Sequence, residues 1–401
     1  LAMQTTGRLH YVDHLRVAAF AMLVVYHSSV AFFPDMDWLI ESADKSAALS
    51  MIMKFPRAWR LALLFFVAGM GTWFAFRATT GAAFLRDRIA RLFVPLLFAM
   101  CVVIVPQVWF ERMHEDGYSG SLVDFWTTRY FAEGKYPDGN FTWAHMWFVA
   151  YLLVMTVVAY PLMRLVASPR LRIVGDCFER LASTNGVYAL FLVPLAFNLA
   201  LTPLFPRQTN SLYNDGAWFA AWASWFALGF MIARHHRAVI DALVERRWMS
   251  ATLAFGVAAF LYRFSWAGTG AIGTYDAVTP FYTALLFALA WTMILALVGF
   301  AARHFNRRIA AMTWLSRRIF PLYILFQKLG WLDTFLPLYV VLPFELGVGA
   351  SFAVVLTATI TLSLLVAVLA DRLPWPFRAL FGLSGDAQSR PASVEPVVLR
   401  N

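Results

Sequence analysis

Long apolar runs alternate with short polar segments along the 401 residues of the chain. A helix needs about 20 apolar residues to cross a bilayer, and the pattern predicts ten such helices. The predicted ranges are 15–33, 57–76, 89–110, 143–165, 186–205, 216–234, 249–266, 279–301, 314–333 and 346–370. Pro321 lies within the ninth range and Pro337 follows it, and either can break this helix, so the apolar run 335–344 also fits a re-entrant segment. The pattern therefore predicts an all-α, polytopic membrane helix bundle.

The composition excludes a soluble globular domain. Hydrophobic residues make up 61% of the chain and charged residues 14%, whereas soluble domains carry about 25% charged residues. The net charge of +10 is spread over short loops between apolar runs, which argues against a nucleic-acid partner. Cys101 and Cys177 are too few for a disulfide framework or a cysteine-based metal site, so we expect no bound metal.

The basic residues predict an orientation. Most of them lie in the N-terminal segment and in every second loop after it, while the longest intervening loops, 34–56 and 111–142, are rich in carboxylates. Because basic loops stay in the cytoplasm, both termini are predicted to be cytoplasmic. We expect no cleavable signal peptide, since the first apolar run is too long and no small-residue cleavage motif follows it.

We expect one transmembrane domain over residues 1–383, followed by a disordered cytoplasmic tail at 384–401. The tail is polar, with the sequence SGDAQSRPASVEPVVLRN. The outer loop 111–142 is long enough to be functional.

Two ionisable residues share one face of the first predicted helix. Arg16 and His27 are 11 residues apart, which at about 100° per residue places them on one stripe, about 16 Å apart along the axis. Ionisable groups inside a membrane are usually functional. The alternatives are that Arg16 is an interfacial anchor and that His27 makes an interhelical hydrogen bond.

Four stretches carry a family resemblance: RLHYVDHLRVAAFAMLVVYH, LLFFVAGMGTWFAF, RDRIARLFVPLL and HMWFVAYLL. Together they resemble the acyltransferase-3 family of integral membrane proteins, and most closely its OpgC-type branch, which succinylates osmoregulated periplasmic glucans. The resemblance implies a multi-pass protein of the bacterial inner membrane. It also implies O-acyl transfer from cytoplasmic acyl-CoA to a hydroxyl of a periplasmic or cell-surface glycan. Succinyl is the preferred acyl group, acetyl is possible, and no tightly bound cofactor is expected.

Within that reading His27 is the expected general base, because a neutral imidazole can take a hydroxyl proton near neutral pH. Arg16 is expected to hold the donor's phosphates or to line the donor's path. Ser28 adjoins His27 but points about 100° away on a helix. Direct transfer is therefore preferred to an acyl-serine intermediate.

Three arginines open the third predicted helix on its cytoplasmic side: Arg86, Arg88 and Arg91. Arg88 and Arg91 are i, i+3 neighbours, and guanidinium groups suit bidentate contacts with phosphate. Related proteins have an Arg-x-x-Arg here, which implies a site for coenzyme A phosphates. The alternative is the ordinary excess of basic residues on the cytoplasmic side.

Several residues are candidates for acceptor binding. The resemblance favours His145 and Trp147 at the outer start of the fourth predicted helix, although a structural histidine and an interfacial tryptophan are the alternatives. Aromatic residues of the outer loop suit stacking on sugars, unless the loop is a passive connection; they are Trp126, Tyr130 and Tyr136. Tyr323 matches the family at the ninth range, but Phe326-Gln327 stands where relatives often carry a second histidine, which weakens the branch assignment.

Three patterns are expected to carry no chemistry. The glycines between Gly268 and Gly273 fit GxGxxG, but no strand precedes them. His10 and His14 have metal-ligand spacing in a polar lead-in, and Asn140 starts a glycosylation sequon of a kind common by chance.

The alternative function is a transporter or flippase for lipid-linked glycans. Proteins of that class commonly show internal repeats, and we find no internal repeat in this sequence.

Overall fold

The computed structural model describes residues 9–36, 41–79, 81–268, 270–274, 277–326 and 346–383. Most of these residues are helical, and the β-type pairing among them is one isolated bridge between Lys135 and Phe141. The all-α prediction is confirmed. Gln327, the run 335–344 and the predicted tail 384–401 lie outside the described residues.

Each of the ten predicted ranges contains a helix or a helix pair. In chain order they are α1 (His10–Val30), α2 (Ala47–Ala78), α3 (Ala82–Phe98) continuing through η1 (Ala99–Val103) into α4 (Val105–Glu115), α6 (Trp147–Val158) with α7 (Tyr160–Ala167), η5 (Asn185–Phe191) with α9 (Leu192–Leu201), α10 (Gly216–Arg234), α12 (Arg247–Leu261) with η6 (Tyr262–Trp266), α13 (Pro280–His304), α14 (Ala310–Phe326) and α15 (Gly347–Asp371). Short elements connect them: α5 (Leu122–Asp124), η2 (Phe125–Arg129), η3 (Ala144–Met146), η4 (Pro169–Leu171), α8 (Arg172–Ala182), α11 (His236–Glu245) and α16 (Phe377–Leu380).

By length and hydropathy, five of the described helices can cross a membrane, or up to seven if each of two bent pairs is one span. The bent pairs are η3 and α6 with α7, which meet at 52°, and η4 and α8 with η5 and α9, which meet at 106°. The chain is thus a multi-pass membrane protein. The count of ten spans and the cytoplasmic position of both termini remain predictions.

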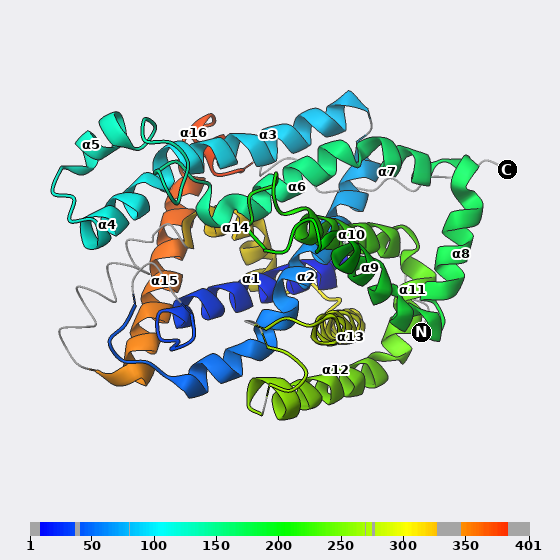
Figure 1. Cartoon of the computed structure of the whole chain (residues 1–401). Coiled ribbons are helices and arrows are strands. Elements are labelled where there is room, and N and C mark those ends of the chain that lie inside the picture. Colours follow the sequence, from blue (N-terminus) through cyan, green and yellow to red (C-terminus); the bar gives the residue numbers. More distant parts are fainter. Residues whose placement is uncertain are drawn as a thin grey trace.

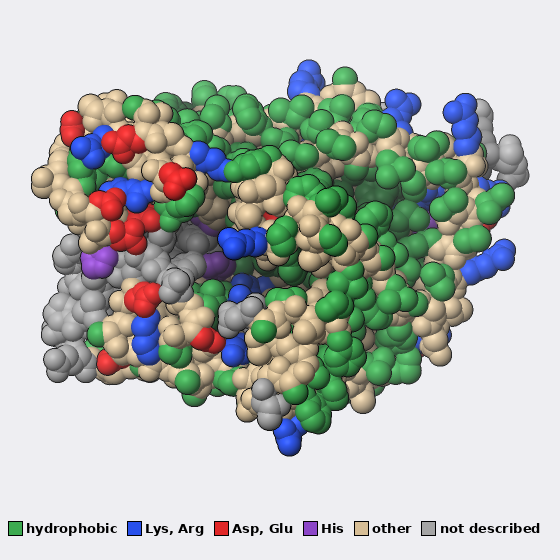
Figure 2. Space-filling model, viewed as in Figure 1, with side chains coloured by type: hydrophobic (Ala, Val, Ile, Leu, Met, Phe, Trp, Pro, Cys, Tyr) green, Lys and Arg blue, Asp and Glu red, His purple; other side chains and the backbone are tan. Residues whose placement is uncertain are grey.

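The two ends of the bundle differ in character. In Figure 1, α4 and α5 lie at the upper left, whereas α8 and α11 lie at the right. Acidic side chains gather at the left end of this face in Figure 2, and hydrophobic side chains cover much of the remainder. The predicted outer loop 111–142 and the predicted inner segments that hold α8 and α11 therefore lie at opposite ends, as the positive-inside pattern requires.

Helix α1 runs through the interior of the bundle and contacts α2, α13, α14 and α15. Its buried residues point in several directions, among them Tyr11, Leu15, Phe20, Leu23, Tyr26 and Val30. A helix that is apolar on nearly all sides is stable only when other helices surround it. The packing thus explains why the polar groups of α1 meet protein rather than lipid.

Paired glycines let α2 and α10 pack closely. A Cβ placed on Gly69 would lie 1.9 Å from Phe226 O, and a Cβ on Gly229 would lie 1.9 Å from Phe66 O. Small residues allow backbones to approach in membrane bundles, where van der Waals packing drives helix association. This crossing fixes α2, and with it the polar residues that α2 presents to α1.

Candidate active site

The His27 ring is held by its own helix. Its Nδ1 lies 2.8 Å from Leu23 O, one turn earlier in α1. A carbonyl oxygen can only accept a hydrogen bond, so Nδ1 carries the proton of the neutral ring. The lone pair of the neutral imidazole is therefore on Nε2.

Arg60 of α2 lies beside His27, and we did not predict it. Its guanidinium carbon is 3.4 Å from the ring centroid of Tyr26, and the Tyr26 and His27 rings meet edge to face at 5.6 Å. Arg60 is 6% exposed and lies within electrostatic range of His27. A charged residue near the start of the second apolar range was the sequence signal for it.

The structure brings Arg16 together with Arg88. These guanidinium groups come from α1 and α3 and lie close enough to interact electrostatically. Arg16 Nη1 is 3.7 Å from Asp13 Oδ1. A Cβ on Gly71 would come within 2.9 Å of Arg16 Nη2, so the glycine leaves room for this side chain.

Asp87 contacts both Arg88 and Arg91. Its Oδ1 accepts a hydrogen bond from Arg91 Nε at 2.8 Å, and its Oδ2 lies 4.0 Å from Arg88 Nε. Arg91 and Arg86 are exposed, whereas Arg88 is half-buried against the ring of Phe84. Arg16, Arg88 and Arg91 thus form one cationic group, which we call the arginine cluster.

His145 and Tyr323 clamp two distant parts of the chain together. His145 Nε2 donates to Tyr323 O at 3.2 Å, and Tyr323 Oη donates to His145 O at 2.5 Å. Both side chains are buried. Tyr323 packs in the same apolar cluster as Leu23, the residue that anchors His27. The pair therefore belongs to the apolar cluster that also contains Leu23.

The aromatic candidates have different environments. Trp147 packs against Phe65 and Tyr151 in the core, with ring centroids 6.1 and 5.1 Å away. Tyr130 is fully buried, and its hydroxyl donates to Met100 O at 2.9 Å. Its ring faces are covered by protein, so we leave it out of the proposed acceptor site.

Two aromatic candidates remain at the outer loop. Trp126 is exposed, and its indole donates to Cys101 O at 2.8 Å. Tyr136 is half-buried, and its hydroxyl donates to Glu111 Oε1 at 2.7 Å. Of the two, Trp126 presents more ring surface to solvent.

A buried carboxylate organises the segment before α10, and the sequence pattern did not single it out. Asp215, at the start of α10, accepts hydrogen bonds from Tyr151 Oη at 2.5 Å and from the backbone nitrogens of Thr209 and Asn210 at 3.1 and 3.2 Å. Burial raises the pKa of the Asp215 carboxyl, and the hydrogen bonds oppose that rise. Asp215 thus joins α6 to the segment before α10.

Replacing Asp215 with Ala should destabilise the protein without touching the arginine cluster or His27. The buried Tyr151 hydroxyl and two partly buried backbone N–H groups would lose their acceptor, and an unsatisfied buried group costs about 1–3 kcal/mol. Thermal unfolding in detergent would measure the effect. Asp176→Ala, which removes an exposed carboxylate of α8, is the control. Equal melting temperatures for the two variants would contradict this role.

Sequence comparison identifies the class of protein. The family model described as an acyltransferase domain matches residues 9–372, so the chain belongs to this acyltransferase-3 family of membrane proteins. The family resemblance noted in the sequence is thereby confirmed. No group of three or more His, Cys, Asp or Glu within the described ranges could hold a metal ion.

Curated relatives are distant. Glucans biosynthesis protein C of Escherichia coli O139:H28 (strain E24377A / ETEC) is 20% identical over 341 residues, which cover 80% of this chain and 82% of that protein. The protein of the same name from Escherichia coli K12 is 22% identical over 158 residues, 38% of each chain. No solved structure matches. These similarities support a membrane acyltransferase and leave its substrates to be proposed.

Proposed function

We propose that the protein transfers an acyl group, preferably succinyl, from cytoplasmic acyl-CoA to a hydroxyl of a periplasmic or cell-surface glycan. The observation that carries this proposal is the His27 ring, oriented by Leu23 O with the lone pair on Nε2. A proton acceptor inside the bundle suits a reaction between a donor and an acceptor on opposite sides of a membrane. Glucan as the acceptor is taken from the relatives' printed name.

The proposed step is a direct transfer. The acceptor oxygen attacks the thioester carbonyl as Nε2 of His27 takes the hydroxyl proton. The carbon–oxygen bond forms, the carbon–sulfur bond breaks, and the leaving coenzyme A thiolate takes the proton back from His27. The products are an O-acyl glycan and free coenzyme A.

The arginine cluster is the proposed binding site for the donor's phosphates. Its guanidinium groups suit bidentate contacts with phosphate oxygens. Arg16 lies 11 residues before His27 on the same helix, which corresponds to about 16 Å of rise. The pantetheine arm separates the phosphates of coenzyme A from the thioester, so one donor molecule can occupy both regions.

Arg60 is the proposed stabiliser of the reaction's negative charge. Attack on the thioester places a negative charge on the carbonyl oxygen. A fixed cation is worth more in a low-dielectric, water-excluded site than in water. The stack of Arg60 on Tyr26, next to His27, places such a cation near the proposed reaction centre.

Replacing Arg88 and Arg91 together with Gln should weaken binding of the donor. A hydrogen bond to a charged group contributes about 1.5–3 kcal/mol, so we expect at least about a tenfold loss in affinity per contact. Isothermal titration of purified protein with succinyl-CoA would measure it. Arg172→Gln, which removes an exposed guanidinium from α8, should leave affinity unchanged.

This prediction also separates the two interpretations of the arginines. If they serve only topology, a well-folded double variant will bind succinyl-CoA as the unmodified protein does. That result would remove the arginine cluster from the proposed donor site.

A further inference from the structure

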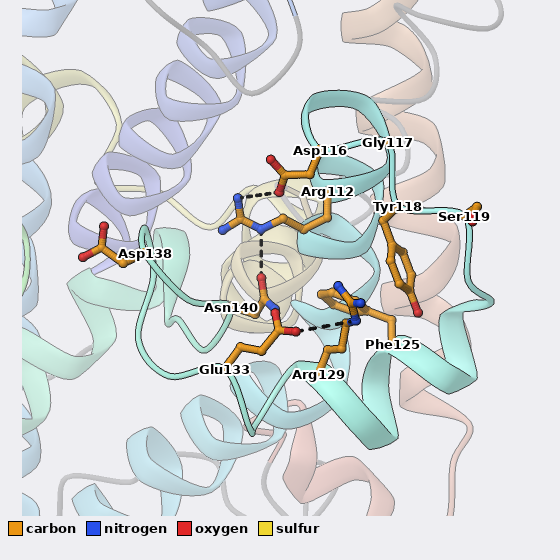
Figure 3. A pocket seen from close by; sticks show the side chains of 10 residues that line it. All are labelled: Arg112, Asp116, Gly117, Tyr118, Ser119, Phe125, Arg129, Glu133, Asp138 and Asn140. Carbon is orange, nitrogen blue, oxygen red and sulfur yellow. Dashed lines mark hydrogen bonds and ion pairs between the residues drawn. The ribbon is translucent and has the colours of Figure 1, made fainter.

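A polar pocket lies in the predicted outer loop. It has a volume of about 570 Å³ and is lined by residues between Arg112 of α4 and Asn140. In Figure 3 the side chains of this segment surround the pocket, with Arg112 on one wall and Arg129 on another. No role has been assigned to this pocket so far.

A buried hydrogen-bond network fixes one wall. Arg112 Nε donates to Asn140 Oδ1 at 2.8 Å, and Nη2 donates to the carbonyl oxygens of Pro137 and Gly139 at 2.9 Å each. Asn140 Nδ2 donates to Glu133 Oε2 at 2.6 Å, and Asn140 is 1% exposed. The wall is therefore preorganised, and Asn140 serves the network rather than glycosylation.

The opposite wall comes from a π-helical turn. In η2 the ring of Phe125 is buried, while Arg129, at the end of the same turn, is exposed. The Arg129 guanidinium carbon lies 4.8 Å from the ring centroid of Tyr118, and its Nε is 3.5 Å from Glu133 Oε1. Such turns occur often at functional sites, and this one places the Arg129 guanidinium group at the pocket.

The charges of the lining select a class of ligand. Two arginines face three carboxylates, those of Asp116, Glu133 and Asp138. The formal balance is negative by one, which disfavours an anion. A ligand with many hydroxyls satisfies both kinds of group, because it donates to carboxylates and accepts from guanidinium.

We infer that this pocket binds neutral sugar residues of the acceptor glycan, at a subsite separate from the reacting hydroxyl. The inference rests on the proposed function, because it assigns the acceptor's binding to the predicted outer loop. It adds a preference: unsubstituted glycan binds better than glycan that already carries succinyl groups. Such a preference would limit how many acyl groups one glycan chain receives.

The test is binding of a neutral glucose oligosaccharide to purified protein in nanodiscs, without acyl-CoA. Asp138→Asn and Arg129→Gln change exposed side chains of the lining and should each lower affinity about tenfold, the loss expected for one hydrogen bond to a charged group. Asp44→Asn, an exposed carboxylate in the separate outer segment 41–46, is the matched control. Thermal unfolding would verify that all three variants remain folded.

The oligosaccharide carrying succinyl groups provides the second arm. The unmodified protein should bind it more weakly than the neutral one, and Asp138→Asn should narrow the difference. Wild-type affinity in both pocket variants, or preferred binding of the succinylated form, would overturn the inference. The binding assay contains no acyl-CoA, so its result does not depend on acyl transfer. A protein that binds the sugar at the pocket but transfers no acyl group would support the inference about the pocket and contradict only the proposed function.

Discussion

Substituting Gln for His27 should abolish acyl transfer while the protein still inserts and folds. Gln keeps hydrogen-bonding ability but cannot accept a proton near neutral pH. We expect a loss of at least about 10²-fold, the lower end for general acid–base catalysis. Transfer to glucan by purified protein in proteoliposomes would measure the rate, and thermal unfolding would verify the fold.

His27→Ala serves as the companion variant. It also removes the bond from Nδ1 to Leu23 O, so it tests whether this contact stabilises the helix. If His27 is only an interhelical contact, Ala should destabilise the bundle by about 0.6–2 kcal/mol and Gln should retain most activity. That pattern would assign His27 a structural role.

Arg60→Gln has the second largest expected effect. If Arg60 stabilises the oxyanion, its loss should lower kcat by about 10²–10³, as for removal of an oxyanion-hole donor. The KM for the acyl donor should change little, because the arginine cluster is untouched. Arg60→Lys keeps the charge but not the planar stack on Tyr26, so we expect partial activity.

Arg57→Gln is the matched control for Arg60. Arg57 lies one turn earlier in α2, and its Nη1 donates to Met36 Sδ at 3.3 Å. Its loss should leave kcat near that of the unmodified protein. A folded Arg60→Gln protein with unchanged kcat would remove Arg60 from the proposed mechanism, and a fall in melting temperature alone would mark it as structural.

Helix positions follow from the sequence because each long apolar run must bury its backbone polar groups in hydrogen bonds. Every predicted range therefore contains a helix. Two bends were not predicted, the break between α6 and α7 and the turn between α8 and η5. Those bends account for two of the apolar ranges that helix length alone does not identify as spans.

The proposed site was predictable only in part. The shared stripe of Arg16 and His27 follows from helix periodicity. The approach of Arg88 in α3 to Arg16 in α1 depends on the tertiary fold and cannot be read from the sequence. Arg60 was visible as a charge in an apolar run, but its stack on Tyr26 depends on the close packing of α2.

The outer loop shows a different limit. Tyr130 and Trp126 are both aromatic residues of this loop, and nothing in the sequence distinguishes their exposure. Tyr130 is buried and Trp126 is exposed because of the way the loop folds. The pocket needs residues from Arg112 to Asn140 to meet. No periodic pattern in the sequence predicts that these residues line one pocket.

The most direct measurement is transfer of a radiolabelled succinyl group from succinyl-CoA to a neutral glucan by the purified, reconstituted protein. We predict labelled succinyl ester on the glucan with the unmodified protein, and none above background with folded His27→Gln. Transfer by folded His27→Gln at a rate close to that of the unmodified protein would contradict the role of His27 as general base. Unlabelled glucan after incubation with the active, folded wild-type preparation would contradict the transferase proposal itself.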